Sequence, residues 1–161
     1  MKKNVGAMLI TPVHCAAINP NPEFLGALLE ITNELSIMDE IMRKPVHYAA
    51  TCVGTGPLEL LLKKGIDARE GDRDKNTPLI LACKYGRVHN VRVLIASANL
   101  LEGDINKKNR EGNAAIHLAA QSGHLECIKE LVKAGANISL NGKYKMTPLI
   151  MASTYGHLEL V

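Results

Sequence analysis

The sequence contains six histidines, a residue type that often binds metal ions or transfers protons. His14, His47 and His117 each stand three residues into copies of a short motif that recurs along the chain. Copies on neighbouring packed helices would lie about 8–10 Å apart, whereas zinc binds its ligands at about 2 Å. These side chains therefore cannot share a zinc ion, and we expect no metal site. The other histidines are expected in turns (His124, His157) or in solvent (His89).

The four cysteines form no metal-binding or catalytic pattern. Cys15, Cys52, Cys83 and Cys127 occupy four different positions relative to the motif, and no two of them make a Cys-x-x-Cys pair. We therefore expect free thiols and a reducing, cytoplasmic location. The sequence contains neither a glycine-rich phosphate loop nor a serine nucleophile elbow. We expect no catalytic residues and no cofactor.

Length and composition predict one folded domain covering residues 1–161. The chain is 47% hydrophobic and 22% charged, which is usual for a globular protein. One Phe, four Tyr and no Trp leave an aliphatic core, which favours packed helices and an all-α fold. A net charge of +3 is too small to indicate a nucleic-acid binder. Three prolines interrupt the longest uncharged stretch, residues 4–22, so we expect no insertion into a membrane.

A seven-residue motif recurs five times, at residues 11–17, 44–50, 77–83, 114–120 and 147–153. The starts of the motifs are 33, 33, 37 and 33 residues apart. Thr and Pro at the first two positions of copies one, three and five suit the N-cap and the first turn of a helix. Copy four begins with Ala114 and lacks such a cap. One column is always alanine, which allows close helix packing: Ala16, Ala49, Ala82, Ala119 and Ala152.

A second helix is expected after each motif. Apolar residues follow the motif start at intervals that place them on one helix face; they are Leu25, Leu28, Leu29, Leu58, Leu61, Leu62, Val91, Leu94, Ile95, Ile128, Leu131, Val132 and Val161. The turn between the two helices carries a glycine in copies three to five, but Pro20 or Val53 in copies one and two. We expect the second helices there to begin at Pro22 and Pro57 and to be short.

Glycines and inserted residues indicate where the second helices end. Gly65 and Gly135 suit left-handed caps after the second helix. Four extra residues lie between Ser97 and Gly103, where a longer loop changes stability little. The insertion contains the adjacent Leu100 and Leu101, expected either to pack on the next repeat or to contact a partner.

The repeat length and segments such as 77–83 (TPLILAC) resemble the ankyrin repeat, a unit of about 33 residues with a Thr-Pro-Leu-His-x-Ala-Ala motif. The resemblance implies an ankyrin-repeat solenoid of stacked helix-turn-helix units with projecting β-hairpin loops, in which the motif histidine makes structural hydrogen bonds. The repeats would span residues 11–43, 44–76, 77–113, 114–146 and, in part, 147–161. Because the last stops midway through its second helix, we expect a fragment of a larger protein.

The resemblance also implies a non-catalytic protein–protein interaction module, a scaffold or adaptor. Ankyrin proteins meet their partners with the hairpin tips and the concave face of the first helices. Carried over by register, the partner-binding positions are Arg73, Asn76, Lys84, Tyr85, Arg110, Asn113, Gln121, Lys143, Tyr144, Met146 and Tyr155, with Asp74, Glu111, Ser122 and Thr154 beside them. Three of the four tyrosines fall in this set, and tyrosine is a favoured interface anchor.

The last two hairpins are basic, which indicates an acidic protein segment as the partner. They contain Lys107, Lys108, Arg110, Lys143 and Lys145 against Glu111. Solvation of the surface is the alternative explanation for these charges. Two other roles remain open for the chain as a whole. It could be a structural segment of a cytoskeletal, ciliary or membrane-channel assembly, or the substrate-recruiting region of an enzyme whose catalytic domain lies elsewhere.

Overall fold

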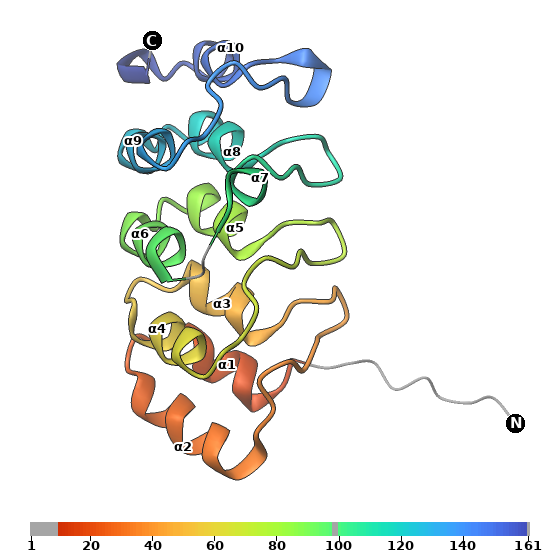
Figure 1. Ribbon diagram of the computed structural model, residues 1–161, viewed down its shortest axis with the longest axis vertical. Helices are drawn as coiled ribbons and strands as arrows, with labels where there is room; N and C mark the ends of the chain where they lie inside the picture. Colours follow the sequence, from red (N-terminus) through yellow and green to blue (C-terminus); the bar gives the residue numbers. More distant parts are fainter. Residues whose placement is uncertain (1–9, 98–99, 161) are drawn as a thin grey trace, which may run out of the picture.

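The computed structural model describes residues 10–97 and 100–160, and these form an elongated stack of helix pairs (Figure 1). The first helix of each pair covers one copy of the motif: α1 (Pro12–Ile18), α3 (Pro45–Thr51), α5 (Pro78–Lys84), α8 (Ala115–Gln121) and α10 (Pro148–Thr154). The second helices are α2 (Pro22–Thr32), α4 (Gly56–Lys63), α6 (Val88–Ser97) and α9 (Leu125–Lys133), followed in the fifth repeat by the 3-10 turn η2 (Leu158–Leu160). The expected all-α solenoid is confirmed.

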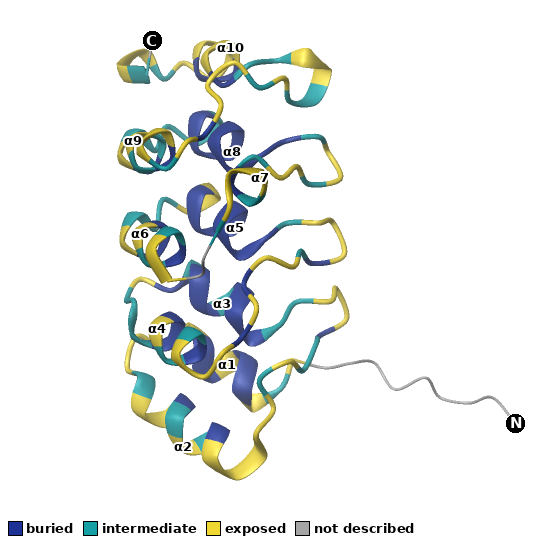
Figure 2. Cartoon of the chain, in the orientation of Figure 1, coloured by how far each residue is buried: buried dark blue, intermediate teal, exposed yellow. Residues whose placement is uncertain are grey.

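The helices form two layers with the core between them. The first helices pack in the order α1, α3, α5, α8 and α10, and the second helices in the order α2, α4, α6 and α9. Buried residues run along the middle of the stack (Figure 2). All five residues of the alanine column are buried, so this column is a helix contact as expected. The apolar stripe of the second helices is narrower than predicted, because Val132 is exposed; Val161 lies outside the described residues.

The glycine turns place neighbouring repeats in contact. Gly86 and Gly123 have φ values of +66° and +74°, a left-handed conformation that glycine adopts readily. A Cβ atom at Gly86 would lie 2.7 Å from the ring of His124, and one at Gly123 would lie 2.6 Å from the ring of His157. Each glycine therefore makes room for a histidine of the following repeat. The predicted left-handed caps at Gly65 and Gly135 are also present.

Repeats one and two leave their first helix differently, because neither Pro nor Val favours a left-handed turn. The C-caps of α1 and α3, Asn19 and Cys52, are extended, with ψ values of 125° and 151°. The carbonyl oxygens at the end of α3 then need other donors. The buried Asn90 of repeat three supplies one, since its Nδ2 lies 2.8 Å from the Cys52 oxygen and 3.2 Å from the oxygens of Ala49 and Ala50.

The expected shortness of the second helix in repeat one is wrong. Helix α2 begins at Pro22 as predicted but extends over 11 residues, compared with 8 in α4. Asn21 caps its start by accepting a hydrogen bond from the Glu23 N–H, and Asn33, with a φ of 52°, ends it as a left-handed C-cap. The missing turn glycine thus changes how the helix begins and leaves its end untouched. Helix α4 begins at Gly56, one residue before the expected position.

The inserted residues of repeat three form an additional short helix, α7 (Glu102–Ile105). Its start is capped by Asp104, whose Oδ2 accepts a hydrogen bond from the Leu101 N–H at 3.1 Å. Leu100 packs against the core, whereas Leu101 is exposed. Leu100 therefore contributes to packing, whereas Leu101 lies on the surface.

Four loops project from one side of the stack between successive repeats (Figure 1). We call their tips fingers one to four, residues 39–43, 72–76, 109–113 and 142–146. The resemblance implied β-hairpins, but the described residues contain no strand in these loops. Each finger is closed by a backbone hydrogen bond from its first N–H to its last carbonyl, such as Asp72 to Asn76 at 3.0 Å. No helix in the described part of the chain is long and apolar enough to cross a membrane.

Candidate partner-binding groove

An acceptor side chain at the first position of the finger organises each of fingers one to three. Oδ1 of Asp72 accepts hydrogen bonds from the backbone N–H groups of Asp74 and Asn76, at 3.0 and 2.9 Å. Asp39 and Asn109 do the same in fingers one and three. These residues follow the spacing of the repeats, so their column could have been identified in the sequence. They hold the tips in a fixed shape.

Finger four has Gly142 at this position and is built differently. A Cβ atom there would lie 2.6 Å from the ring of His117 and 2.7 Å from Oδ1 of Asn113, so only glycine fits. Two consecutive residues of this finger, Tyr144 and Lys145, have left-handed φ values of 55° and 58°. This conformation is unfavourable for a bulky residue. It leaves the Tyr144 ring exposed at the tip.

The motif histidines of repeats one, two and four join their repeat to the following finger loop, and they make structural hydrogen bonds as the resemblance implied. Nδ1 of His117 accepts a hydrogen bond from the Ala114 N–H at 3.2 Å, and Nε2 lies 2.9 Å from the carbonyl oxygen of Leu140. His14 and His47 make the same two kinds of contact, with Arg43 and Glu70 as the carbonyl partners. Burial lowers the pKa of His47 to about 4 and also lowers the pKa of His117.

The remaining histidines and cysteines show no arrangement for metal binding. His157 lies 2.9 Å from the carbonyl oxygen of Gln121 and links repeat five to repeat four, whereas His89 is exposed. No three His, Cys, Asp or Glu side chains within residues 10–97 and 100–160 are grouped to hold a metal ion. Cys83 and Cys127 do lie together, although their sequence positions did not suggest it, and burial raises the pKa of Cys83. All four cysteines are free thiols.

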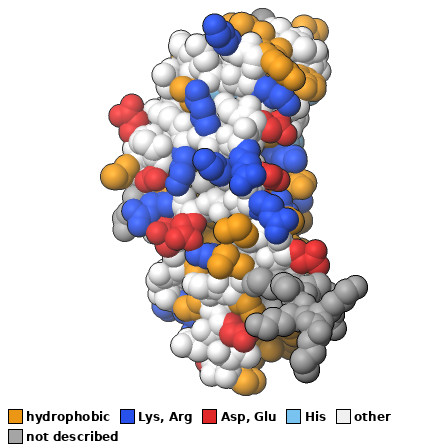
Figure 3. Space-filling view, turned by 90° about the vertical axis from the view of Figure 1, so that its right-hand side faces the viewer, with side chains coloured by type: hydrophobic (Ala, Val, Ile, Leu, Met, Phe, Trp, Pro, Cys, Tyr) orange, Lys and Arg blue, Asp and Glu red, His pale blue; other side chains and the backbone are white. Residues whose placement is uncertain are grey.

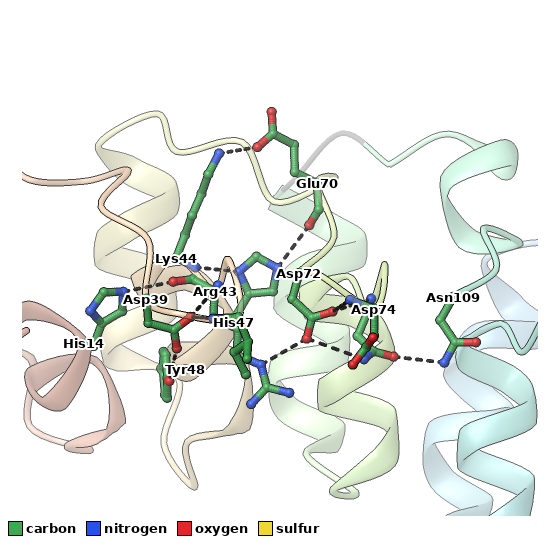
Figure 4. Close-up of polar contacts among 12 residues, drawn as sticks. His14, Asp39, Arg43, Lys44, His47, Tyr48, Glu70, Asp72, Asp74 and Asn109 are labelled. Atoms are coloured by element: carbon green, nitrogen blue, oxygen red, sulfur yellow. Dashed lines mark hydrogen bonds and ion pairs between the residues drawn. The ribbon is translucent and has the colours of Figure 1, made fainter. Parts of the chain in front are cut away.

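A polar network connects the first two fingers to the helices (Figure 4). Nε of Arg43 lies 3.0 Å from Oδ2 of the buried Asp72, and the hydroxyl of Tyr48 donates to Asp39. Burial and the Asp39 hydrogen bond raise the pKa of Tyr48 to about 12. Lys44 forms an ion pair with Glu70. Tyr48, the one tyrosine outside the predicted surface, is therefore a structural residue.

A groove of about 640 Å³ lies between fingers two and three and the first helices of the following repeats. Eight of the predicted or neighbouring positions line it: Asp74, Asn76, Lys84, Arg110, Glu111, Gln121, Ser122 and Tyr155. The structure adds three that sequence reasoning missed, Arg43, Asn109 and Leu118. Arg43 occupies the same repeat position as the predicted Asn76, Asn113 and Met146, so the repeat spacing could have indicated it. Asn109 and Leu118 belong to columns that had not been assigned to the binding surface.

Other predicted positions lie outside this groove. Arg73 donates from its guanidinium to the carbonyl of Glu40, and Tyr85 is exposed at the end of α5. Lys143, Tyr144 and Met146 belong to finger four, where Nζ of Lys143 lies 5.3 Å from the centre of the Tyr144 ring.

The expected exposure of Asn113 is wrong. Its side chain is only 3% exposed. Its Oδ1 accepts a hydrogen bond from the Lys143 N–H at 2.9 Å, so Asn113 joins finger three to finger four. Its side chain connects two neighbouring repeats and is not available to a partner. The position of Asn113 within the repeat does not by itself reveal this contact.

Some charged side chains of the groove form ion pairs within the chain and others do not. Arg43 is paired with Asp72, and Glu111 lies 3.4 Å from Nζ of Lys143. Lys84 and Arg110 form no ion pair with any residue that the structure describes. The hydroxyl of Tyr155 accepts a hydrogen bond from Nε2 of Gln121 at 2.9 Å and keeps its own proton to donate. The groove therefore offers cationic and neutral donors, together with the carboxylates of Asp74 and Glu111, beside a small apolar floor at Leu118.

Comparison with known proteins agrees with this architecture. The sequence profile described as "Ankyrin repeats (3 copies)" matches residues 13–102 and 98–161. The chain belongs to the ankyrin repeat family. Ankyrin repeats are protein–protein interaction modules, and the repeats themselves are non-catalytic.

Several larger proteins are similar to this ankyrin array. It is 33% identical to poly [ADP-ribose] polymerase tankyrase of Caenorhabditis elegans, over 94% of this chain and 7% of that protein. It is 30% identical to human neurogenic locus notch homolog protein 1, over 88% of the chain and 5% of that protein. It is 36% identical to the rat nuclear factor NF-kappa-B p105 subunit, over 79% of the chain and 14% of that protein. The chain thus spans a small part of each of these relatives.

Proposed function

We propose that this ankyrin array binds an acidic segment of a partner protein in the groove between fingers two and three and the first helices. The observation that carries the proposal is the pair of cations, Lys84 and Arg110, that line the groove without an ion-pair partner in the described chain. An anionic ligand would pair with these two cations through charge-assisted hydrogen bonds. Tyr155 at the edge of the groove supplies a rigid aromatic contact.

The side chains in and around the groove favour a role in binding over a role in catalysis. The three motif histidines are engaged in hydrogen bonds to the following finger loops, and three of the four thiols are buried. The groove is lined by amide, hydroxyl and charged side chains on rigid elements, which suits recognition of a peptide. The free thiols also support residence in a reducing, intracellular compartment. We therefore assign the segment the role of an adaptor with no catalytic activity of its own.

A titration with a defined probe tests the proposal. A fluorescein-labelled peptide with six consecutive glutamates is titrated with the chain at two salt concentrations, and binding is followed by fluorescence anisotropy. We expect Lys84→Glu and Arg110→Glu each to weaken binding at least fivefold, and the affinity of the wild type to fall with salt. Tyr155→Ala should weaken binding while keeping the salt response.

The matched control is Lys129→Glu on α9, which reverses a charge on the opposite layer of helices. Lys129 pairs with Glu126 and does not line the groove, so its replacement makes the same change in net charge without altering the groove. Equal loss of binding in this control and in Arg110→Glu would show that the peptide responds to net charge, and the groove assignment would be wrong.

A further inference from the structure

The chemistry of the finger tips changes along the stack. The three central residues of finger one are Glu40, Ile41 and Met42, whereas those of finger four are Lys143, Tyr144 and Lys145. Viewed from the finger side, Lys and Arg side chains gather across the middle of the molecule, with hydrophobic side chains below them towards repeat one (Figure 3). The side chains of Ile41 and Met42 are 39% and 48% exposed.

The first helices change in the same direction. Ile18 in α1 occupies the register position of Lys84 in α5 and of Gln121 in α8, both of which line the groove. Ile18 is 46% exposed. The apolar residues of repeat one are thus presented on the same face as the polar groove. We call Ile18, Ile41 and Met42 the apolar half of the concave face.

The two halves are continuous. Arg43 lines the groove and directly follows Met42 in finger one. Fingers one and two are joined by a hydrogen bond from the Arg73 N–H to the Ile41 carbonyl at 2.8 Å, and fingers two and three by one from the Arg110 N–H to the Asp74 carbonyl at 2.8 Å. A ligand that lies across fingers two and three therefore meets finger one next, with no gap in the backbone surface.

Charge limits what the apolar half can accept. Residues 10–42 contain no Lys or Arg, and the exposed Glu40 stands at the tip of finger one beside Ile41. An acidic segment that continued from the groove onto finger one would approach Glu40, and like charges disfavour such a contact. Burial of Ile18, Ile41 and Met42 against an apolar ligand would remove their side chains from water and would favour binding.

We infer that the occupant of the concave face is one extended segment of a partner protein that is acidic over fingers two to four and apolar over finger one. This inference rests on the proposed function and extends it. Stacked repeats are about 10 Å apart, so the four fingers span about 30 Å. An extended chain rises about 3.3 Å per residue, and about nine residues cover the whole face.

Synthetic peptides of matched length test the inference. One peptide joins four glutamates to a four-residue leucine and isoleucine block through a Gly-Ser spacer, and a second has the reverse order. A third keeps the glutamates and replaces the apolar block with Gly and Ser. We expect one of the two orders to bind the chain at least tenfold more tightly than the third peptide, as measured by fluorescence anisotropy.

Substitution of the apolar half assigns the gain to its residues. Ile18→Ser combined with Ile41→Ser should remove most of the tenfold gain and leave the affinity for the third peptide unchanged. Both side chains are exposed, and a thermal melt checks that the variant folds. Val132→Ser on α9 is the control, since it removes an equally exposed apolar side chain from the other helix layer.

The outcomes separate the inference from the proposed function. If neither two-block peptide exceeds the third, or if the gain survives in the double variant, the inference is wrong while acidic binding in the groove can stand. If Arg110→Glu fails to weaken even the third peptide, the proposed function itself is wrong, and the inference falls with it.

Discussion

At the residue scale, the buried polar side chains of the array connect one repeat to the next. His47 reaches the carbonyl of Glu70, Asp72 holds finger two and receives Arg43, and Asn113 reaches finger four. Buried polar groups are expensive to leave without hydrogen bonds. These residues are therefore committed to structure, and binding depends on the neighbours that remain exposed.

His47 makes the stability of the array depend on pH. The folded chain binds a proton at this residue only near pH 4, whereas an unfolded chain binds one near pH 6.5. At pH 7.5 the residue is neutral in both states. As the pH falls from about 6.5 to 4 the unfolded state gains the proton first, so the free energy of unfolding should fall by up to about 3 kcal/mol. Urea unfolding at several pH values measures this change.

The control for this pH dependence is a pair of substitutions. His47→Gln should flatten the dependence between pH 6.5 and 4, whereas His89→Gln, at an exposed site, should leave it unchanged. If His47→Gln and the wild type share the same slope, the dependence arises from other groups such as His117, whose pKa burial also lowers.

The sequence predicted which residues lie on the surface of the groove better than it predicted the contacts that they make. Register placed Lys84, Arg110, Gln121 and Tyr155 on the exposed side of the repeats, and all four line the groove. The same reasoning failed for Asn113, because a backbone N–H in the next finger captures its side chain. Contacts between residues 30 or more positions apart depend on how the repeats stack. An alignment of the repeats shows which residues are equivalent, but it does not show which side chains meet across a junction.

At the element scale, the turn between the two helices of a repeat determines how the repeat meets its neighbour. With glycine in this turn, the histidine of the next repeat packs over the backbone, as His124 does at Gly86. Without glycine, the helix end is extended and needs donors from the next repeat. The departure from glycine at Pro20 and Val53 was visible in the sequence, but the compensating role of Asn90 was not.

Replacement of the turn glycine should cost more than replacement of a glycine in open space. Gly65→Ala should lower the free energy of unfolding by about 1 kcal/mol, because Gly65 has a left-handed φ of 86° and no atom near its Cβ position. Gly86→Ala should cost a further 1–3 kcal/mol, roughly the effect of overpacking, because the new methyl group meets the His124 ring at 2.7 Å. Chemical denaturation of both variants compares them.

A double variant isolates the contact with the histidine. His124→Ala in the Gly86→Ala background should recover part of the lost stability, because it removes the ring that the methyl group meets. If the two glycine variants are equally destabilised, or if removal of the ring gives no recovery, then backbone strain accounts for the whole effect and the contact does not.

The start of α8 offers a stabilising substitution. Ala114 provides no side-chain cap, whereas Thr77 at the same position in repeat three accepts a hydrogen bond from the Ile80 N–H at 3.3 Å. Ala114→Thr with Ala115→Pro should raise the free energy of unfolding by about 1 kcal/mol, through the added cap and a less flexible unfolded chain. Thermal unfolding measures it. A lower midpoint would show that the buried Ala114 site has no room for threonine.

At the scale of the whole molecule, the array is a row of similar units whose stability depends on intrinsic and nearest-neighbour energies. The repeat length and the alanine column predicted the stacking, because both describe contacts that recur in each unit. The sequence did not predict which junction would differ from the others. The junction between repeats two and three is distinctive, since repeat three supplies Asn90 and Arg87 to the end of α3.

Removal of these donors should uncouple the first two repeats from the rest. Arg87 donates from Nε to the Thr51 carbonyl at 2.8 Å, and Asn90 bonds three further carbonyl oxygens of the same helix end. Asn90→Ala leaves buried acceptors without a donor, which costs about 1–3 kcal/mol at this interface. Because repeats interact only with neighbours, the loss should appear as separate unfolding of repeats one and two at lower urea concentration.

Hydrogen exchange measured by mass spectrometry at increasing urea concentration detects this separation along the chain. In the Asn90→Ala variant, amides of α1 to α4 should exchange at lower urea than those of α8 and α9, whereas in the wild type the difference should be smaller. Asn141→Ala, at an exposed position in the loop of finger four, is the matched control and should behave as the wild type. Cooperative exchange of all repeats at an unchanged midpoint would mean that apolar packing of α3 on α5 couples this junction, with Asn90 adding nothing measurable.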